Sequence, residues 1–494
     1  MVSNPIKKLA GQTAVYGLSS IIGRLLNYLL VPLYTRLFLP EVYGVVTELY
    51  AYVSFLLIIL TYGTETGFFR FARDNENFNK TYSGLLASLT LTSLLFVLLI
   101  YLFIEPLAAA MQYSLHSEYI IWMALIVALD AIISLPFARL RLENKAMRFA
   151  MLKLLNIGIN IGMNLYFLLL CPYLAKTNPD SIFLLVWSPQ IGVGYVFISN
   201  LIANLVSLLL FIPDFFRLRT GIDLKWLRKI LWYSLPLLIA GLAGMVNETL
   251  DRILLKYCLP DGVNAMEQIG IYGANYKLAI LMTLFVQMFR YAADPFFFSQ
   301  AKNADAKQTY ARVMNYFVIC GLIIFLGVML YLDIIKYFIA PAYHSGLNVV
   351  PILLLANLFL GMYYNMSFWY KLNDKTRYGA YIAVGGAILT ITLNIIMIPL
   401  LGFTGAAWAT FACYLAMLVV SYLLGQKHYP VKYPVKSIVF YFAAALAIYF
   451  ISLYIPETGR FLHYTINTVL MLAFIVIVTL SEGLFKRFLK RAKG

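Results

Sequence analysis

The chain has 494 residues, of which 62% are hydrophobic and only 12% are charged, and its mean hydropathy is +0.81. An average soluble chain carries about 25% charged residues, so the composition excludes a soluble globular protein as well as a disordered or collagen-like one. Four cysteines are too few for a disulfide scaffold. We therefore expect an integral membrane protein.

Apolar stretches long enough to cross a bilayer, which takes roughly 20 residues, recur along the whole chain. They lack the alternation of polar and apolar residues that marks barrel strands, so we expect an all-α protein. The first stretch contains Arg24 and lacks a small-residue cleavage site, which favours a retained span over a signal peptide. The predicted spans are 12–38, 42–66, 82–103, 118–138, 150–170, 188–211, 230–256, 268–293, 312–332, 347–370, 378–398, 403–424, 437–455 and 460–485.

The charge distribution supports about fourteen spans. With both termini in the cytoplasm, 29 of the 38 Lys and Arg residues lie on the inner side, six lie outside and three lie at membrane depth. Cytoplasmic loops of membrane proteins are rich in these residues, so the net charge of +16 needs no nucleic-acid partner. We expect a multi-pass membrane protein with both termini in the cytoplasm.

The two halves of the sequence resemble each other. Val42–Leu49 is similar to Ile271–Leu278, and Leu142–Lys145 is similar to Leu372–Lys375 at nearly the same offset. Six spans per copy give both copies one orientation, so we expect a parallel repeat with a site between two six-helix lobes; the alternative is chance likeness of Leu- and Tyr-rich spans. The predicted divisions are an N-lobe at 1–213, a C-lobe at 214–426, and two further helices with a basic cytoplasmic tail at 427–494.

Arg24 lies about 18 Å into the first span, at 1.5 Å per residue, and a charge at that depth is costly. Thr13, Tyr16, Ser20 and Asn27 share its helical face. Such a polar stripe does not face lipid, so it either lines a water-filled lumen or forms a buried helix contact. We predict that Ser20, Arg24 and Asn27 bind substrate.

Three further charges lie at membrane depth. Lys277, in the eighth span, is predicted to bind substrate with Arg24, although it could extend toward the membrane surface. Glu48 is its equivalent in the first half. Asp130 lies in the middle of the fourth span, and its carboxylate is either a proton or cation site or a partner for Arg24. Asp130 and Glu48 are therefore the candidate ion-coupling residues.

A row of polar residues on the fifth span, Lys153, Asn156, Asn160 and Asn164, could hold sugar hydroxyls or join helices. The sequence has no phosphate-binding loop of an ATPase and no metal-ligand or Cys-x-x-Cys spacing. We therefore expect no cofactor and no metal.

Several segments resemble the multidrug/oligosaccharidyl-lipid/polysaccharide (MOP) exporter superfamily, in its polysaccharide transporter, O-antigen flippase-like branch. They are Val31–Leu37, Pro40–Gly44, Tyr233–Leu237, Asp251–Leu255 and Gly270–Lys277. The resemblance implies two six-helix lobes around a cationic lumen, in which basic residues meet an anionic head group. Arg24 and Lys277 match that role by position.

The resemblance further implies a secondary-active flippase of a bacterial cytoplasmic (inner) membrane, driven by an H⁺ or Na⁺ gradient, and not an enzyme. Its substrate would be a polyprenyl-pyrophosphate-linked oligosaccharide, moved to the outer leaflet for polysaccharide, lipopolysaccharide or O-antigen biosynthesis. The expected partners are this lipid-linked oligosaccharide, membrane lipids and the polysaccharide polymerase machinery. The alternatives are a peptidoglycan lipid-linked precursor flippase, a multidrug exporter of the same superfamily, and a membrane glycan polymerase or ligase, which would need a long catalytic outer loop.

Overall fold

The computed structural model describes residues 17, 19, 21–72, 75–216, 223–301, 303, 305–373, 375–455 and 459–483. These residues form helices, turns and short connections, and none of the described residues is in a strand. Twelve of the described helices are long and apolar enough to cross a membrane, and a bent helix pair makes a thirteenth. The prediction of an all-α protein with about fourteen spans is confirmed, although the first predicted span, 12–38, is described only in part.

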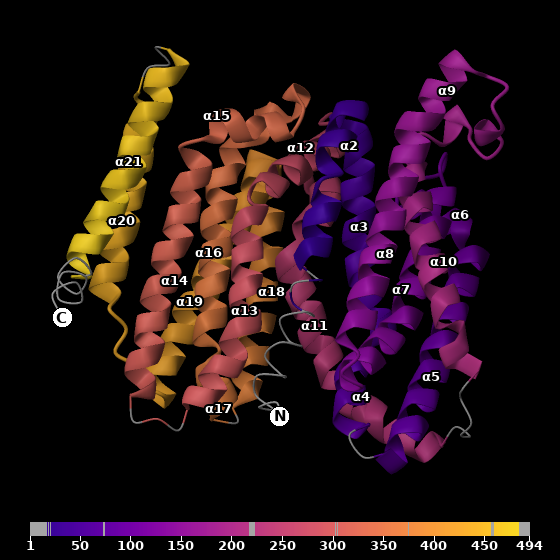
Figure 1. The fold of residues 1–494 in the computed structure, drawn as a ribbon, viewed down its shortest axis with the longest axis horizontal. Helices are drawn as coiled ribbons and strands as arrows, with labels where there is room; N and C mark the ends of the chain where they lie inside the picture. Colours follow the sequence, from indigo (N-terminus) through magenta and orange to yellow (C-terminus); the bar gives the residue numbers. More distant parts are fainter. Residues whose placement is uncertain are drawn as a thin grey trace, which may run out of the picture. The chain divides into compact units, whose positions relative to one another are not determined.

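The chain divides into two compact units, residues 1–270 and 271–494. The helices of the first unit are α2 (Val31–Leu37), α3 (Pro40–Thr61), α4 (Thr64–Phe71), α5 (Asn75–Leu102), α6 (Ile104–Ala110), α7 (Glu118–Leu142), α8 (Ala146–Leu165), α9 (Cys171–Thr177), α10 (Gly194–Phe216) and α11 (Leu224–Cys258) (Figure 1). Residues 21–28, before α2, are also helical.

The α12 helix (Ala265–Leu278) begins in the first unit and ends in the second. The second unit continues with α13 (Ile280–Gln300), α14 (Ala306–Met329), α15 (Leu332–Ile335), a 3₁₀ stretch (Pro341–Val349), α16 (Val350–Met366), α17 (Phe368–Leu372), α18 (Thr376–Leu401), α19 (Phe403–His428), α20 (Val435–Leu453) and α21 (Arg460–Ser481).

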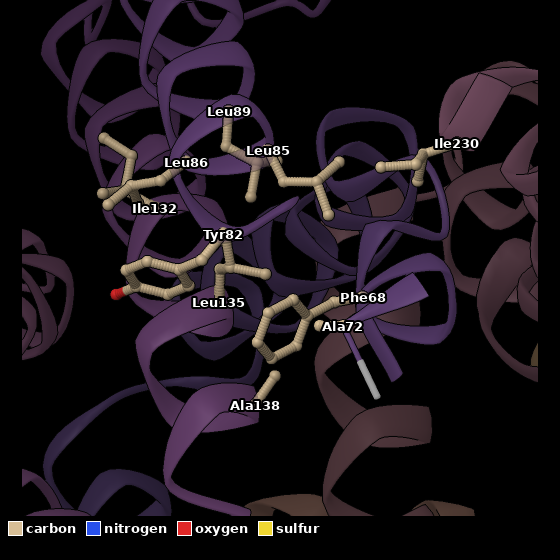
Figure 2. Packing of buried hydrophobic residues seen from close by; sticks show 10 residues of the cluster. All are labelled: Phe68, Ala72, Tyr82, Leu85, Leu86, Leu89, Ile132, Leu135, Ala138 and Ile230. Carbon is tan, nitrogen blue, oxygen red and sulfur yellow. The ribbon is translucent and has the colours of Figure 1, made fainter. Parts of the chain in front are cut away.

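The α7 helix is the centre of the first unit, and α3, α5, α8 and α10 pack against it. Figure 2 shows a cluster of buried apolar side chains in which α4, α5, α7 and α11 meet. Phe68, Leu85 and Ile230 are fully buried there. Because Ile230 comes from α11, this cluster fixes a helix that is distant in sequence to the first helices of the chain.

The division into units differs from the lobe boundary expected at 213/214, because α11 lies in the first unit. In the first turn of α11, the Trp226 indole donates a hydrogen bond of 2.9 Å to Thr81 of α5. In the last turn of α11, the Tyr257 hydroxyl lies 3.1 Å from the Tyr52 hydroxyl of α3. The boundary at 213/214 is derived from the internal repeat, and it stays a prediction about that repeat. By its packing, α11 belongs with the helices before it.

In the second unit, α16 packs against α13, α14 and α19, and α18 packs against α19. The α20 helix packs on α14 and on α21, which also contacts α14. Several buried aromatic rings, among them Tyr310, Phe368 and Trp369, form a cluster in the same unit. The C-terminal pair predicted as an appendage is therefore anchored mainly through one helix.

Two predicted spans are shaped differently from the expectation. The span at 268–293 is broken into α12 and α13, which meet at an angle of 54°. The span at 188–211 begins late, at Gly194, because Ser188 and Pro189 start a separate 3₁₀ turn and Gly192 has a φ of 50°. Proline lacks the N–H that a continuous helix needs in its interior, which explains the late start.

Candidate functional site

Arg24 and Asn27 lie on the helical stretch 21–28, and both side chains are exposed in the structure. Gly23 lets this stretch lie close to α8, since a Cβ at that position would collide with the Cδ1 atom of Ile157. Asn160 of α8 also donates a hydrogen bond to the Asn27 Oδ1 atom, 3.2 Å long. The contact holds the segment that carries Arg24 against α8. Ser20, the third predicted substrate residue of this span, lies outside the described residues.

The three asparagines of α8, Asn156, Asn160 and Asn164, differ in how deeply they are buried. Asn164 is fully buried: the Tyr34 hydroxyl donates to its Oδ1 atom at 2.9 Å, and its amide donates to the Asn160 carbonyl at 2.8 Å. It therefore joins α2 to α8, as the helix-contact alternative predicts. Asn156 and Asn160 are only half-buried.

Asp130 of α7 lies in a polar cluster formed with α8 and α10. Its Oδ1 atom accepts a hydrogen bond of 2.9 Å from Asn204, whose own carbonyl accepts one of 3.1 Å from Asn156. The Asn156 amide also donates to Ser207 at 2.9 Å. Sequence reasoning found Asp130 and Asn156 separately, but only the fold places them in one hydrogen-bonded chain.

Lys153 is the cation whose charge acts on the Asp130 carboxylate. Its Nζ atom lies 4.3 Å above the centre of the Phe137 ring on α7. Arg24 acts electrostatically on Lys153 in turn. A basic neighbour from another helix therefore accompanies Asp130, and sequence reasoning, which considered Arg24 for this place, did not identify Lys153 as that neighbour.

Glu48 takes part in a buried ion pair. The Lys256 Nζ atom lies 3.0 Å from its Oε2 atom, and the two side chains are 2% and 0% exposed. The Tyr113 hydroxyl donates to the same oxygen at 2.6 Å, and Lys256 also donates to the Met111 carbonyl at 2.6 Å. This arrangement gives Glu48 a structural role between α3 and α11, and its role in ion coupling stays a prediction.

Lys277 lies in the last turn of α12, directly before the bend, and its side chain is half-buried. A cation in the last turn of a helix is stabilised by the partial negative charge of the helix end. At such a break the backbone groups need other partners, and in membrane proteins irregular backbone is tolerated where it is buried in protein or lines a cavity. The end of α12 therefore stabilises the Lys277 ammonium electrostatically, in addition to the predicted role of Lys277 in substrate binding.

The first unit thus combines a guanidinium, an ammonium, a carboxylate and several amides within the membrane-spanning region. Among the residues that the structure describes, no three His, Cys, Asp or Glu side chains are grouped as metal ligands. The chemistry available here is the binding of anions, hydroxyls and small cations. The groups concerned are Arg24, Asn27, Asp130, Lys153, Asn156, Asn160 and Asn204.

A family model described as "Polysaccharide biosynthesis protein" matches residues 9–176 and 180–301, more than half of the chain. No match was found among curated protein sequences.

Solved structures of transporters resemble the chain over nearly its whole length. A lipid II flippase, MurJ, in an inward closed conformation has a TM-score of 0.68 and 16% identity, covering 94% of this chain and 99% of its own. A multidrug resistance MATE family transporter of the MOP superfamily, facing inward, has a TM-score of 0.64 and 14% identity, with 86% of this chain and 98% of its own covered. An outward-facing multidrug resistance MATE family transporter of the MOP superfamily has a TM-score of 0.61 and 16% identity, covering 86% of this chain and 96% of its own. At these identities the likeness shows the fold.

Proposed function

Because the chain belongs to the polysaccharide biosynthesis protein family and has the fold of the MOP superfamily transporter and the lipid II flippase, we propose that it is a flippase for a lipid-linked oligosaccharide. The substrate would be an oligosaccharide on a polyprenyl pyrophosphate, moved from the cytoplasmic to the outer leaflet of a bacterial inner membrane for polysaccharide or O-antigen synthesis. Both chain termini would be cytoplasmic, and the polymerase machinery would take up the product.

The observation that carries this proposal is the polar surface around Arg24 in the first unit. A pyrophosphate can be held bidentately by a planar guanidinium, which keeps its charge at any physiological pH. The half-buried side chains of Asn156 and Asn160 lie on the neighbouring helix. The Asn156 Oδ1 atom can accept from a sugar hydroxyl, and the second N–H of Asn160 can donate to one. Lys277 is the proposed second cation.

We assign energy coupling to an H⁺ or Na⁺ gradient and place Asp130 first among the candidate residues. Its carboxylate accepts a hydrogen bond of 2.9 Å from the neutral amide of Asn204, so a proton or a cation can still change its charge. Glu48 comes second, because its partner Lys256 already balances its charge at 3.0 Å. No cofactor is required in this scheme.

The alternatives are a flippase for a lipid-linked peptidoglycan precursor, favoured by the likeness to the lipid II flippase, and a multidrug exporter, favoured by the MATE fold. Both share the alternating-access mechanism of transporters with repeated halves. They differ from the main proposal in the ligand that the polar surface receives.

Transport by the purified full chain in vesicles discriminates between these functions. Three probes would be compared: a fluorescent polyprenyl-pyrophosphate oligosaccharide, a fluorescent lipid-linked peptidoglycan precursor, and a fluorescent organic cation. An impermeant quencher measures how much of each lipid changes leaflet, and dye exclusion measures export of the cation.

We expect the oligosaccharide lipid to move in response to an imposed ion gradient and the other two probes to remain in place. Movement of the peptidoglycan precursor alone would establish the first alternative, and movement of the organic cation alone would establish the second.

A further inference from the structure

A cavity of about 400 Å³ lies in the second unit, at the ends of four helices. Its wall is formed by the end of α14, by α15, by the 3₁₀ stretch before α16, and by the facing ends of α20 and α21. No residue of the predicted substrate or ion-coupling sites lines it. Leu330 and Asn467 form its buried part, and Asp333, Asn348 and Ser452 lie at its more exposed part.

The polar side chains around this cavity are held in defined orientations. The Asn467 amide donates to the Leu330 carbonyl at 2.6 Å and lies 3.0 Å from the Nε2 atom of His463. The first contact fixes which end of the amide carries nitrogen, so Nε2 of a neutral His463 accepts from it and the ring proton lies on Nδ1. His463 therefore presents an N–H at Nδ1 and Asn467 presents a carbonyl oxygen.

Neither of these two groups has a hydrogen-bond partner among the described residues. Asn467 is only 1% exposed, and both its Oδ1 atom and the Nδ1 atom of His463 are buried. A buried polar group without a partner is costly, by about 1–3 kcal/mol. Both residues line the cavity, so rotation of their side chains would turn these two atoms toward a ligand there.

The remaining lining selects the kind of ligand. The Asp333 carboxylate lies 2.8 Å from the Lys336 ammonium, so its charge is already balanced and a strongly anionic ligand gains little. A carboxylate and a carbonyl oxygen require donors from the ligand, whereas an N–H requires an acceptor, and a hydroxyl supplies both. The lining also includes the apolar residues Leu332, Leu347, Pro351 and Leu453.

From this combination we infer that the cavity binds the sugar part of a glycolipid head group, with the apolar residues against the adjoining chain. Its volume falls at the lower end of the roughly 300–1,000 Å³ typical of small-molecule sites. The cavity adjoins the 333–346 segment, which the sequence places on the outer side of the membrane. That the sugar belongs to the exported glycan rests on the proposed function. Sugar binding by the cavity is independent of it.

Photolabelling of the purified full chain in phosphatidylcholine nanodiscs tests this inference without any transport step. The probe is a dodecyl glucoside with a diazirine on the chain, and labelled peptides are identified by mass spectrometry. Excess dodecyl glucoside and excess dodecyl phosphocholine serve as competitors with the same hydrocarbon and different head groups.

We expect labelling within 329–351 and 449–467 that dodecyl glucoside removes and dodecyl phosphocholine does not. Asn348→Leu and Asp333→Asn should each weaken the labelling roughly two- to tenfold, the range for loss of one hydrogen bond. Thr465→Val is the matched control, because Thr465 is exposed on α21, bonds to its own helix at Phe461 and does not line the cavity.

Equal competition by both detergents would show binding of hydrocarbon alone and overturn the inference, as would labelling that is absent from both segments. A loss of labelling in Thr465→Val equal to that in the cavity variants would also overturn it. Failure of the vesicle transport assay with labelling intact would instead count against the proposed function alone.

Discussion

Arg24 is the residue from which the proposed substrate chemistry can be tested most directly. Its side chain is exposed on a segment held to α8 through Asn27 and Gly23. If it binds a pyrophosphate, Arg24→Ala should abolish glycan export while the amount of protein in the membrane stays normal. The expected loss of affinity is tenfold or more, since a hydrogen bond to a charged group contributes about 1.5–3 kcal/mol.

Charge and geometry can be separated at this position. Arg24→Lys keeps the charge without the planar fork and should retain some export, whereas Arg24→Glu should be worse than the alanine variant. Arg36→Ala is the control, because Arg36 is an exposed arginine on the next helical segment that donates to the Pro32 carbonyl at 3.1 Å. Normal export by Arg24→Ala, measured with binding of the labelled substrate, would remove Arg24 from the mechanism.

Asp130 allows a second test at the residue scale. If its carboxylate carries the coupling ion, Asp130→Asn should abolish gradient-driven transport and leave substrate binding within about twofold, because binding is assigned to other groups. If Asp130 only balances Lys153, the same variant should lower thermal stability, and adding Lys153→Gln should restore it. Recovery of both stability and transport in the double variant would contradict the coupling role.

At the scale of elements, the buried pair of Glu48 and Lys256 fixes the end of α11 to α3. Removing one member of a buried ion pair leaves an uncompensated charge, at a cost of about 3–5 kcal/mol, whereas replacing both is often nearly neutral. We expect Lys256→Met to lower the unfolding temperature strongly and the double change with Glu48→Gln to recover most of the loss. Equal instability of the single and double variants in thermal unfolding would show that the pair is not coupled.

The opposite end of α11 is joined to α5 through Asp223 and Lys80, 2.7 Å apart. The hydrogen bond from Lys80, together with one from the Trp226 N–H, lowers the pKa of the Asp223 carboxylate below its ordinary value. The resulting stabilisation is complete above the unfolded pKa, about 3.9, and is lost as the pH falls through the lower native pKa.

Protease susceptibility of this segment should therefore be unchanged between pH 7 and 5 and should rise only below about pH 4. In Lys80→Gln, susceptibility should already be higher at pH 7 and the further rise below about pH 4 should be smaller, because less stabilisation remains to be lost. A rise that begins near pH 6 in the unchanged protein would indicate a different titrating group.

For the whole molecule, the testable expectation is topology. Single cysteines in residues 139–149, 214–229 and 371–377 should react only from the cytoplasmic side, and those in 171–186 and 333–346 only from the outside. The reason is the excess of Lys and Arg in the first set of segments. Labelling of the 139–149 segment from outside by an impermeant reagent would contradict the fourteen-span arrangement and the parallel repeat.

The sequence by itself determined the membrane-spanning, all-helical class and the approximate position of most helices. Hydrophobic length is a local property, since a helix in a bilayer satisfies its own backbone hydrogen bonds and needs only about 20 apolar residues. The same local reasoning identified Arg24, Asp130 and Lys277 as costly charges. It also identified the family, through short segments such as Gly270–Lys277 that remain contiguous in the chain.

Only the tertiary structure decided which of these groups meet. Glu48 and Lys256 are distant in sequence, as are Asp130 and Asn204, and no helical periodicity relates either pair. The break before Ile280 interrupts an apolar stretch without a proline at that point, so local pattern did not reveal it. Partners across helices depend on how the helices pack, because a charge in hydrocarbon is stabilised by whichever group the fold brings to it.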